Sequence, residues 1–267
     1  MNRIVALLGK EVADLRQNPT IFLAAALTGF FSLLIPFFVA IVVPYFAGER
    51  LSDSSDFELA VEMYRTQPEF RDLDPEAAIQ AWVFQTFLIF MMITPVAGAM
   101  SVAAYSVVGE KQARTLEPLL ATPITTMELL AAKVLGALLP ALTLTIVYYG
   151  LYVAAIAVAA MPGVSRVVLS PRSLAIVFVL GPLASLLALQ LAVCVSSRVN
   201  DSRTAQQIGA LVVLPITALM VAQLMGTLQL TVALTALIAL GLVVLNVVLL
   251  RIAVMLFNRE AILTRWR

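Results

Sequence analysis

Six long runs of apolar residues constrain this chain more than any other feature of its sequence. A helix needs about 20 consecutive, mostly apolar residues to cross the roughly 30 Å hydrocarbon core of a bilayer. Each run approaches or exceeds that length, and the charged residues gather in clusters between the runs. We therefore predict an all-α integral membrane protein with six transmembrane helices. The predicted spans are residues 20–46, 80–108, 131–160, 173–196, 208–227 and 230–250.

Composition supports the same class of protein. Hydrophobic residues make up 61% of the 267 and charged residues 12%, whereas a soluble domain is nearer half apolar and a quarter charged. The single cysteine, Cys194, excludes an internal disulfide. The absence of histidine excludes His-based metal sites, catalytic triads and proton relays. We expect no catalytic, cofactor-binding or metal-ligating residue in this chain.

Lysine and arginine predict the orientation, because cytoplasmic loops carry an excess of both. Of the 17 such residues, 12 lie on the side that holds both predicted termini, and five lie on the other side. Both termini are therefore predicted to be cytoplasmic, in the plasma membrane. The five on the outer side are Arg50, Arg65, Arg71, Arg166 and Arg172.

Residues 47–79 form the one sizeable extracytoplasmic segment. The segment holds nine acidic residues and three arginines, a net charge of −6. Ser55 and Glu58 have the spacing of a capping box and predict a short helix on the outer surface. Asp74 followed by Pro75 predicts the start of the helix that becomes the second span. A solvated acidic face explains this segment better than a cation site does.

The first 19 residues predict an interfacial helix. Apolar residues within 2–18 form one helical stripe, and cationic residues occupy the opposite face, as in helices that lie at a membrane surface. Asn18 and Pro19 then end the helix before the first span. The stripe consists of Ile4, Leu7, Leu8, Val12 and Leu15.

A polar stretch, GEKQARTLEPLLATPITTMELLAAKVLG (109–136), separates the second and third spans. Leu116, Leu119 and Leu120 share one helical face, Thr115 is placed to cap that helix, and Pro123 ends it. Such a helix either lies on lipid or inserts into a groove of a partner, and its physics leaves both alternatives open. The next helix is predicted to begin at a second capping-box pattern, Thr125 with Glu128.

Uncharged polar residues inside the spans are candidates for a translocation path. No Asp, Glu, Lys or Arg lies near a span centre, which argues against proton coupling and against a multiply charged substrate. Each of these polar residues is also compatible with a role in hydrogen bonding between helices. Such a path could be lined by Gln85, Thr86, Thr94, Ser101, Tyr105, Gln190, Gln223 and Asn246, of which all except Thr86 and Tyr105 are predicted as site residues.

The pattern from Gly109 to Lys133, G-E-K-x-x-x-T-L-E-x-L-L-x-T-P-I-x-x-x-E-L-L-x-x-K, resembles the signature region of type-2 ATP-binding-cassette (ABC) permeases. GKEVADLRQNP near the start, SSRVNDSRTAQQIGALVVLP and the final FNREAILTRWR are similar to the sodium-efflux type. The resemblance covers nearly the whole chain and implies one transmembrane domain, 1–267, with a cytoplasmic tail at 251–267. The segment 47–79 is the part least like the family.

The resemblance also assigns roles to two segments. It implies that residues 1–19 are an elbow helix, and that 109–130 holds the coupling helix that docks on a nucleotide-binding subunit. The coupling residues would be Glu110, Thr115, Leu116, Glu117, Leu119, Leu120 and Pro123.

The implied function is that of the permease subunit of an ATP-driven exporter of an ion, drug or lipid-like substrate. The chain has no G-x-x-x-x-G-K-[ST] motif, so ATP and Mg²⁺ would belong to a partner ATPase, and the chain itself is not expected to be an enzyme. Expected partners are that ATPase, a second identical or paralogous permease, and membrane lipid, with no nucleic acid.

Three alternative functions compete with this one. The complex could transmit force across the membrane, or the chain could be an ion-coupled secondary transporter or channel without an ATPase. An intramembrane enzyme would need H-E-x-x-H, paired acids within the membrane, or a serine with a base. The sequence lacks the first two, and Lys133 lies at the cytoplasmic edge of its span.

Overall fold

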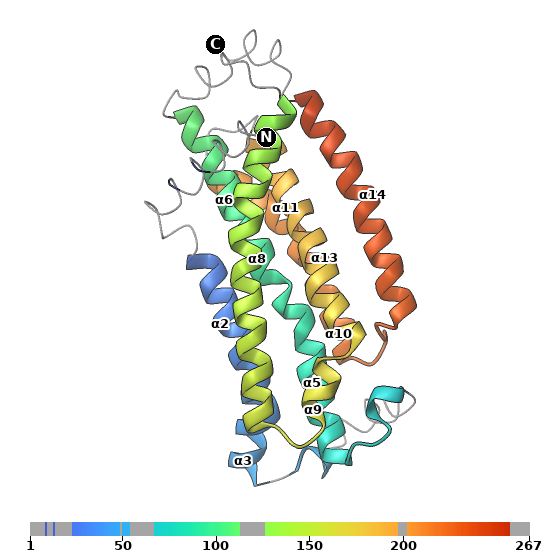
Figure 1. The fold of residues 1–267 in the computed structure, drawn as a ribbon. Helices are drawn as coiled ribbons and strands as arrows, with labels where there is room; N and C mark the ends of the chain where they lie inside the picture. The colour runs from blue at the N-terminus through green and yellow to red at the C-terminus, as the bar shows by residue number, and fades with distance from the viewer. Residues whose placement is uncertain are drawn as a thin grey trace.

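A computed structural model describes residues 9, 13, 23–48, 50–53, 67–112, 126–196 and 202–256. These residues form a bundle of long helices that lie side by side, and they contain no strand (Figure 1). In chain order the elements are α2 (Leu23–Phe37), the π-helix η2 (Phe38–Val42), α3 (Val43–Ala47), the 3-10 helices η3 (Leu51–Asp53) and η5 (Pro68–Phe70), α5 (Pro75–Met91), α6 (Ile93–Gln112), α8 (Thr126–Ala159), α9 (Val164–Val168), α10 (Pro171–Ala175), the π-helix η6 (Ile176–Leu180), α11 (Gly181–Ser196), α12 (Ser202–Gly209), the 3-10 helix η7 (Ala210–Val212), α13 (Val213–Leu224) and α14 (Val232–Leu256).

Among the residues that the structure describes, six helical stretches are long and apolar enough to cross a membrane, which confirms the predicted class. Each end of these stretches lies within five residues of the corresponding end of a predicted span. The stretches are Ala25–Ala47, Pro75–Ala103, Glu128–Ala159, Pro171–Ser196, Gln206–Leu224 and Val232–Met255. The predicted interfacial helix at 1–19, the surface helix near residue 58 and the coupling helix lie outside the described residues, apart from residues 9 and 13.

Prolines shape the first and fourth spans. The π-helices η2 and η6 each end two residues before a proline, Pro44 and Pro182 respectively. In η6 the amide of Gly181 bonds to the carbonyl of Ile176, five residues back instead of four. A proline has no N–H and its ring presses on the carbonyl four residues earlier. A widened turn accommodates both effects and keeps the backbone hydrogen-bonded inside the membrane.

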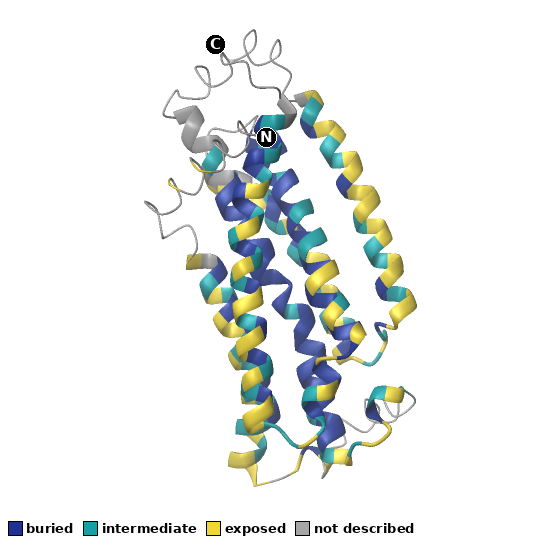
Figure 2. Cartoon of the chain, viewed as in Figure 1, coloured by how far each residue is buried: buried dark blue, intermediate teal, exposed yellow. Residues whose placement is uncertain are grey.

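Helix α5 lies at the centre of the bundle and α14 at its edge. In the most apolar part of the second span 89% of the residues are buried, whereas in that of the sixth span 11% are buried (Figure 2). The rings of Phe37, Phe84 and Tyr152 pack together around α5, with centroids 4.9 to 5.8 Å apart. The Tyr152 hydroxyl also donates a 2.8 Å hydrogen bond to the Phe84 carbonyl, which fixes α8 against α5.

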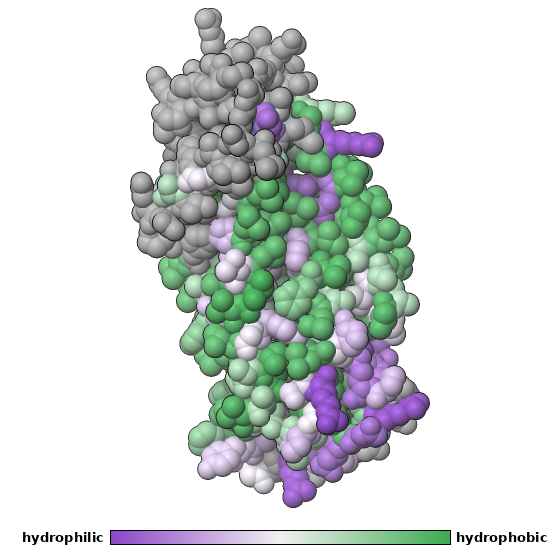
Figure 3. All heavy atoms as spheres, viewed as in Figure 1, coloured by the Kyte–Doolittle hydropathy of each residue, from purple (hydrophilic) through white to green (hydrophobic). Residues whose placement is uncertain are grey.

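Apolar side chains cover the middle of the visible face, and hydrophilic residues gather near one end (Figure 3). We call this end, which includes α3, η5 and α9, the α9 end. We call the opposite end, where α6 finishes and α8 begins, the α6–α8 end. An apolar middle that gives way to a polar end is the pattern expected of a protein that spans a bilayer.

Candidate functional site

All six polar residues that the sequence proposed for a translocation path are buried, with 6% or less of each residue exposed. They come from five helices, and none of them faces outward from the bundle. The residues are Gln85 on α5, Thr94 and Ser101 on α6, Gln190 on α11, Gln223 on α13 and Asn246 on α14.

Gln85 belongs to a polar group at the α9 end that we call the Arg172 cluster, formed by Gln67, Glu69, Gln85, Arg172 and Ser173. Arg172 is 4% exposed, and its guanidinium lies 3.5 Å from the Glu69 carboxylate. The same guanidinium donates hydrogen bonds to the side-chain oxygens of Gln67 and Gln85 and, at 3.3 Å, to a backbone carbonyl before α14. A buried charge is stable only with such partners.

The amide of Gln85 completes the Arg172 cluster. Its nitrogen donates to Glu69 at 3.3 Å and to the Ser173 hydroxyl at 3.1 Å. The cluster thus joins four segments that are distant in sequence: the segment at η5, α5, α10 and the turn between α13 and α14. Gln85 therefore has a structural role at one end of the bundle, and its amide groups are already engaged.

Sequence reasoning counted Arg172 only as one outer positive charge and missed this cluster. A local signal was present, because Ser170 and Pro171 form a helix start just before Arg172. The Ser170 hydroxyl accepts the amide hydrogen of Ser173 at 3.3 Å, as an N-cap does. That signal places Arg172 in the first turn of α10. The signal does not identify the partners of Arg172, which lie 58 to 105 residues away in sequence.

Thr94 and Gln190 differ from Gln85, because each keeps a buried oxygen without a hydrogen-bond partner among the described residues. Thr94 is 0% exposed and Gln190 4%. Leaving a buried acceptor unsatisfied costs on the order of 1–3 kcal/mol. Ser101 lies seven residues after Thr94, on the same face of α6, and α6 packs along α11, which carries Gln190. Polar capacity thus remains in the interior of the bundle.

Asn246 supports the alternative role in helix packing. Its amide nitrogen donates to the carbonyl of Leu183 at 3.0 Å, which joins α14 to α11, and to the carbonyl of Leu242 at 2.8 Å. Gln223 is 4% exposed near the end of α13. The side-chain oxygen of Asn246, however, has no hydrogen-bond partner among the described residues. Asn246 therefore joins two helices through its amide nitrogen and also keeps spare hydrogen-bonding capacity.

Of the predicted coupling residues, only Glu110 has a described backbone, in the last turn of α6. Thr115, Leu116, Glu117, Leu119, Leu120 and Pro123 lie outside the described residues. The helices that flank this segment are joined at the α6–α8 end, where buried Lys133 donates a 2.7 Å hydrogen bond to the Ser106 hydroxyl. The described part of helix α8 starts at Thr126; Thr125, the first residue of the predicted capping pattern, lies outside the described residues.

In the part of the chain that the structure describes, six apolar helical stretches enclose buried, uncharged polar side chains, which defines a helical membrane protein. The sequence model of the ABC-2 family transporter proteins matches residues 65–248, just over two thirds of the chain. The protein therefore belongs to the ABC-2 transporter family, and is a multi-pass membrane component of a transport system. No curated protein and no solved structure matches the chain.

Proposed function

We propose that the protein is the permease subunit of an ATP-driven exporter. A separate nucleotide-binding subunit would hydrolyse ATP with Mg²⁺, and this chain would convert that step into outward movement of a substrate. The permease would act as a pair, either with a second identical chain or with a paralogue. Its own chain would carry no ATPase activity.

The family match supports this proposal most strongly. The matched residues, 65–248, include the second to fifth spans and the segment 109–130, which carries the predicted coupling helix. Because the chain lacks a phosphate-binding loop, the energy for transport must come from a partner in this scheme. The leucines of the 116–120 segment would be the surface that the partner holds.

The proposed path runs along the interior of the bundle past Thr94, Ser101 and Gln190. Thr94 and Gln190 are buried, and their unbonded oxygens can accept hydrogen bonds from water or from a substrate. The absence of charge at the span centres favours an amphipathic molecule or a weakly held ion. The sodium-efflux type remains the subtype that the sequence resemblance favours.

The proposed orientation places both termini and the α6–α8 end in the cytoplasm, with the plasma membrane as the location. In a Cys194→Ala background, a single cysteine at Ser54 should react with a membrane-impermeant maleimide from outside. A cysteine at Thr125 should react only after permeabilisation. The reverse labelling pattern would contradict the topology.

Affinity purification tests the function. The tagged chain, isolated from native membranes in mild detergent, should bring with it an ATPase that carries G-x-x-x-x-G-K-[ST]. The complex in vesicles should move a substrate only with MgATP, and a partner variant that lacks the P-loop lysine should abolish this movement. Isolation of a complex without an ATPase, or substrate movement driven by an ion gradient alone, would contradict the proposal.

A further inference from the structure

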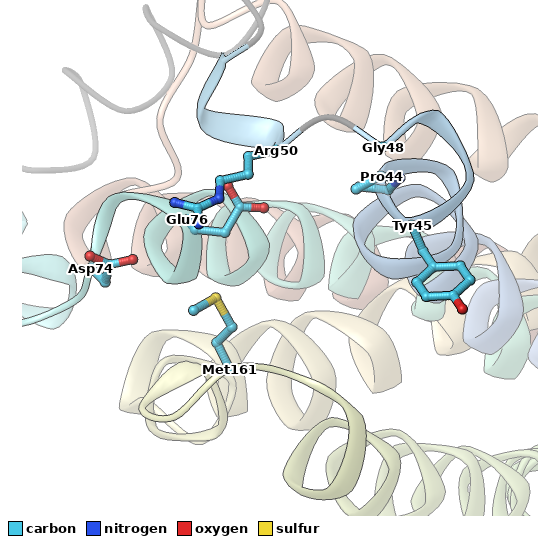
Figure 4. A pocket seen from close by; sticks show the side chains of 7 residues that line it. All are labelled: Pro44, Tyr45, Gly48, Arg50, Asp74, Glu76 and Met161. Atoms are coloured by element: carbon cyan, nitrogen blue, oxygen red, sulfur yellow. The ribbon is translucent and has the colours of Figure 1, made fainter.

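A pocket of about 580 Å³ opens at the α9 end, away from the polar interior described above. Figure 4 shows Arg50 beside Glu76, between Asp74 and Tyr45, with Met161 facing them. Three segments supply its walls: α3 with the residues that follow it, the start of α5, and the chain just after α8. The lining residues are Pro44, Tyr45, Gly48, Arg50, Asp74, Glu76 and Met161.

The pocket lies where three spans meet the membrane surface. The first span ends at Ala47, the second begins at Pro75 and the third ends at Ala159, so the pocket walls begin where the apolar stretches stop. Gly48 ends α3 in the left-handed region, at φ +68°, and its amide bonds to the Pro44 carbonyl at 3.0 Å. This turn brings Arg50 back over the pocket. The lipid head groups of the outer leaflet would lie at the same depth.

Two of the charged side chains in the pocket are available to a ligand. The Glu76 carboxylate accepts the backbone amide hydrogens of Leu51 at 3.2 Å and Ser52 at 3.0 Å, which holds η3 in place next to Arg50. Neither the Arg50 guanidinium nor the Asp74 carboxylate forms an ion pair or side-chain hydrogen bond with any residue that the structure describes. A fixed wall thus presents one cation and one free carboxylate.

An exposed apolar surface continues from the pocket along the first span. Tyr45 and Phe46 are both 81% exposed and pack edge to face, with centroids 5.6 Å apart. Phe38 and Val43, on the η2 and α3 turns that lie deeper in the hydrocarbon, are also exposed. Exposed aromatic residues at this depth are typical of the membrane interface, and the aliphatic surface beyond them suits acyl chains.

We propose that this pocket binds a phospholipid whose head group carries both a phosphodiester and a primary ammonium, as phosphatidylethanolamine does. Arg50 would pair with the phosphate, for which its planar guanidinium is well suited. The ammonium would donate to Asp74 and to the remaining acceptor capacity of Glu76. The acyl chains would lie against Val43 and Phe38.

The charges select among head groups. Two carboxylates and one arginine give the pocket a net negative charge, which disfavours a head group that carries only negative charge. A quaternary ammonium has no N–H to donate to Asp74. The assignment does not rest on the proposed transport function, because the pocket would bind lipid with or without an ATPase partner.

Native mass spectrometry of the delipidated chain tests this site. The protein is titrated with phosphatidylethanolamine and with phosphatidylglycerol that have the same acyl chains. We expect phosphatidylethanolamine to bind roughly tenfold more tightly, and Arg50→Gln or Asp74→Asn to remove most of that preference. Arg71→Gln and Asp72→Asn are matched controls, since both residues are exposed at the same end but lie outside the pocket.

Three outcomes would overturn the proposal. One is equal retention of the two lipids by the wild-type chain. A second is an unchanged preference in Arg50→Gln and Asp74→Asn while their thermal midpoints equal that of the wild type. The third is complete displacement of the lipid by soluble glycerophosphoethanolamine at an equal concentration, which would show that the site takes the free head group and makes no use of the acyl chains.

Discussion

The guanidinium of Arg172 lies 3.5 Å from the carboxylate of Glu69, although 103 residues separate them in the chain. Arg172 is 4% exposed and Glu69 25% exposed, so the pair is buried mainly on the arginine side. Through this pair and the Gln85 amide, the segment before α5 is held against the start of the fourth span. The Arg172 cluster therefore organises the α9 end of the bundle.

Removing the arginine should destabilise the protein. Arg172→Gln leaves Glu69 and the two glutamines without their common donor, and breaking a buried ion pair costs about 3–5 kcal/mol. We expect the lower end of that range, because Glu69 can turn toward water. The thermal midpoint in detergent measures the loss. Arg166→Gln is the control, since Arg166 is an exposed arginine at the same end and should tolerate the change.

Close packing between α2 and α8 depends on Gly29. A methyl group added at Gly29 would lie 2.3 Å from the ring of Tyr148, and the Tyr148 hydroxyl donates a 2.9 Å hydrogen bond to the Ala26 carbonyl. Gly29→Ala should displace the ring and lower the thermal midpoint, by an amount corresponding to roughly 1–3 kcal/mol.

Gly150→Ala provides the matched control for that substitution. Nothing lies within 4 Å of a methyl group at Gly150 on α8. Alanine is also the better helix former, so Gly150→Ala should leave the midpoint unchanged or raise it slightly. Equal midpoints for the two variants would show that the close approach of α2 and α8 does not depend on Gly29.

The long-range parts of the structure were the ones that the sequence could not predict. Run length locates the six spans, and Asp74 before Pro75 locates the start of α5, because these are local properties of the chain. The partners of Arg172 cannot be read locally, since they arrive from three other segments. The π-helical turns before Pro44 and Pro182 were not predicted from the sequence either, and only the structure shows that the backbone widens there.

The candidate translocation path also depends on long-range contacts that the sequence could not predict. Its polar residues are buried, but the sequence could not show which of their polar atoms find partners. The amide nitrogens of Gln85 and Asn246 bond to other helices, whereas the side-chain oxygens of Thr94, Gln190 and Asn246 have no partner among the described residues. That distinction depends on the geometry of neighbouring helices. Of the predicted coupling residues, six stay sequence predictions, because they lie outside the described residues.

A path role for Gln190 can be distinguished from a structural one by a single substitution. Gln190→Leu removes a buried oxygen that has no partner among the described residues. The thermal midpoint should therefore stay the same or rise, because the cost of an unsatisfied acceptor disappears. Transport should fall roughly tenfold if the amide contacts the substrate with a hydrogen bond worth about 1.4 kcal/mol.

Ser185→Ala on the same helix is the control for Gln190. The Ser185 hydroxyl donates only to the Gly181 carbonyl one turn back, at 2.6 Å. Ser185→Ala should therefore change neither the thermal midpoint nor the transport rate strongly. If Gln190→Leu lowered the midpoint and left transport unchanged per folded molecule, Gln190 would be a packing residue.

We propose that an ATPase engages this chain through the leucines between α6 and α8. Burying a leucine side chain contributes about 1.5–3 kcal/mol, so changing Leu116 and Leu119 together to Asp removes most of a modest contact. Glu117→Lys should weaken the contact less, because a charge at the rim of an interface is partly screened.

The most direct measurement is the yield of ATPase that co-purifies with tagged chains present at equal abundance in the membrane. We expect Leu116→Asp with Leu119→Asp to abolish co-purification and export, while cysteine labelling shows normal topology. Recovery of the ATPase with the double variant at the wild-type yield would show that these leucines do not hold the ATPase, and would make the segment a helix that lies on the membrane surface.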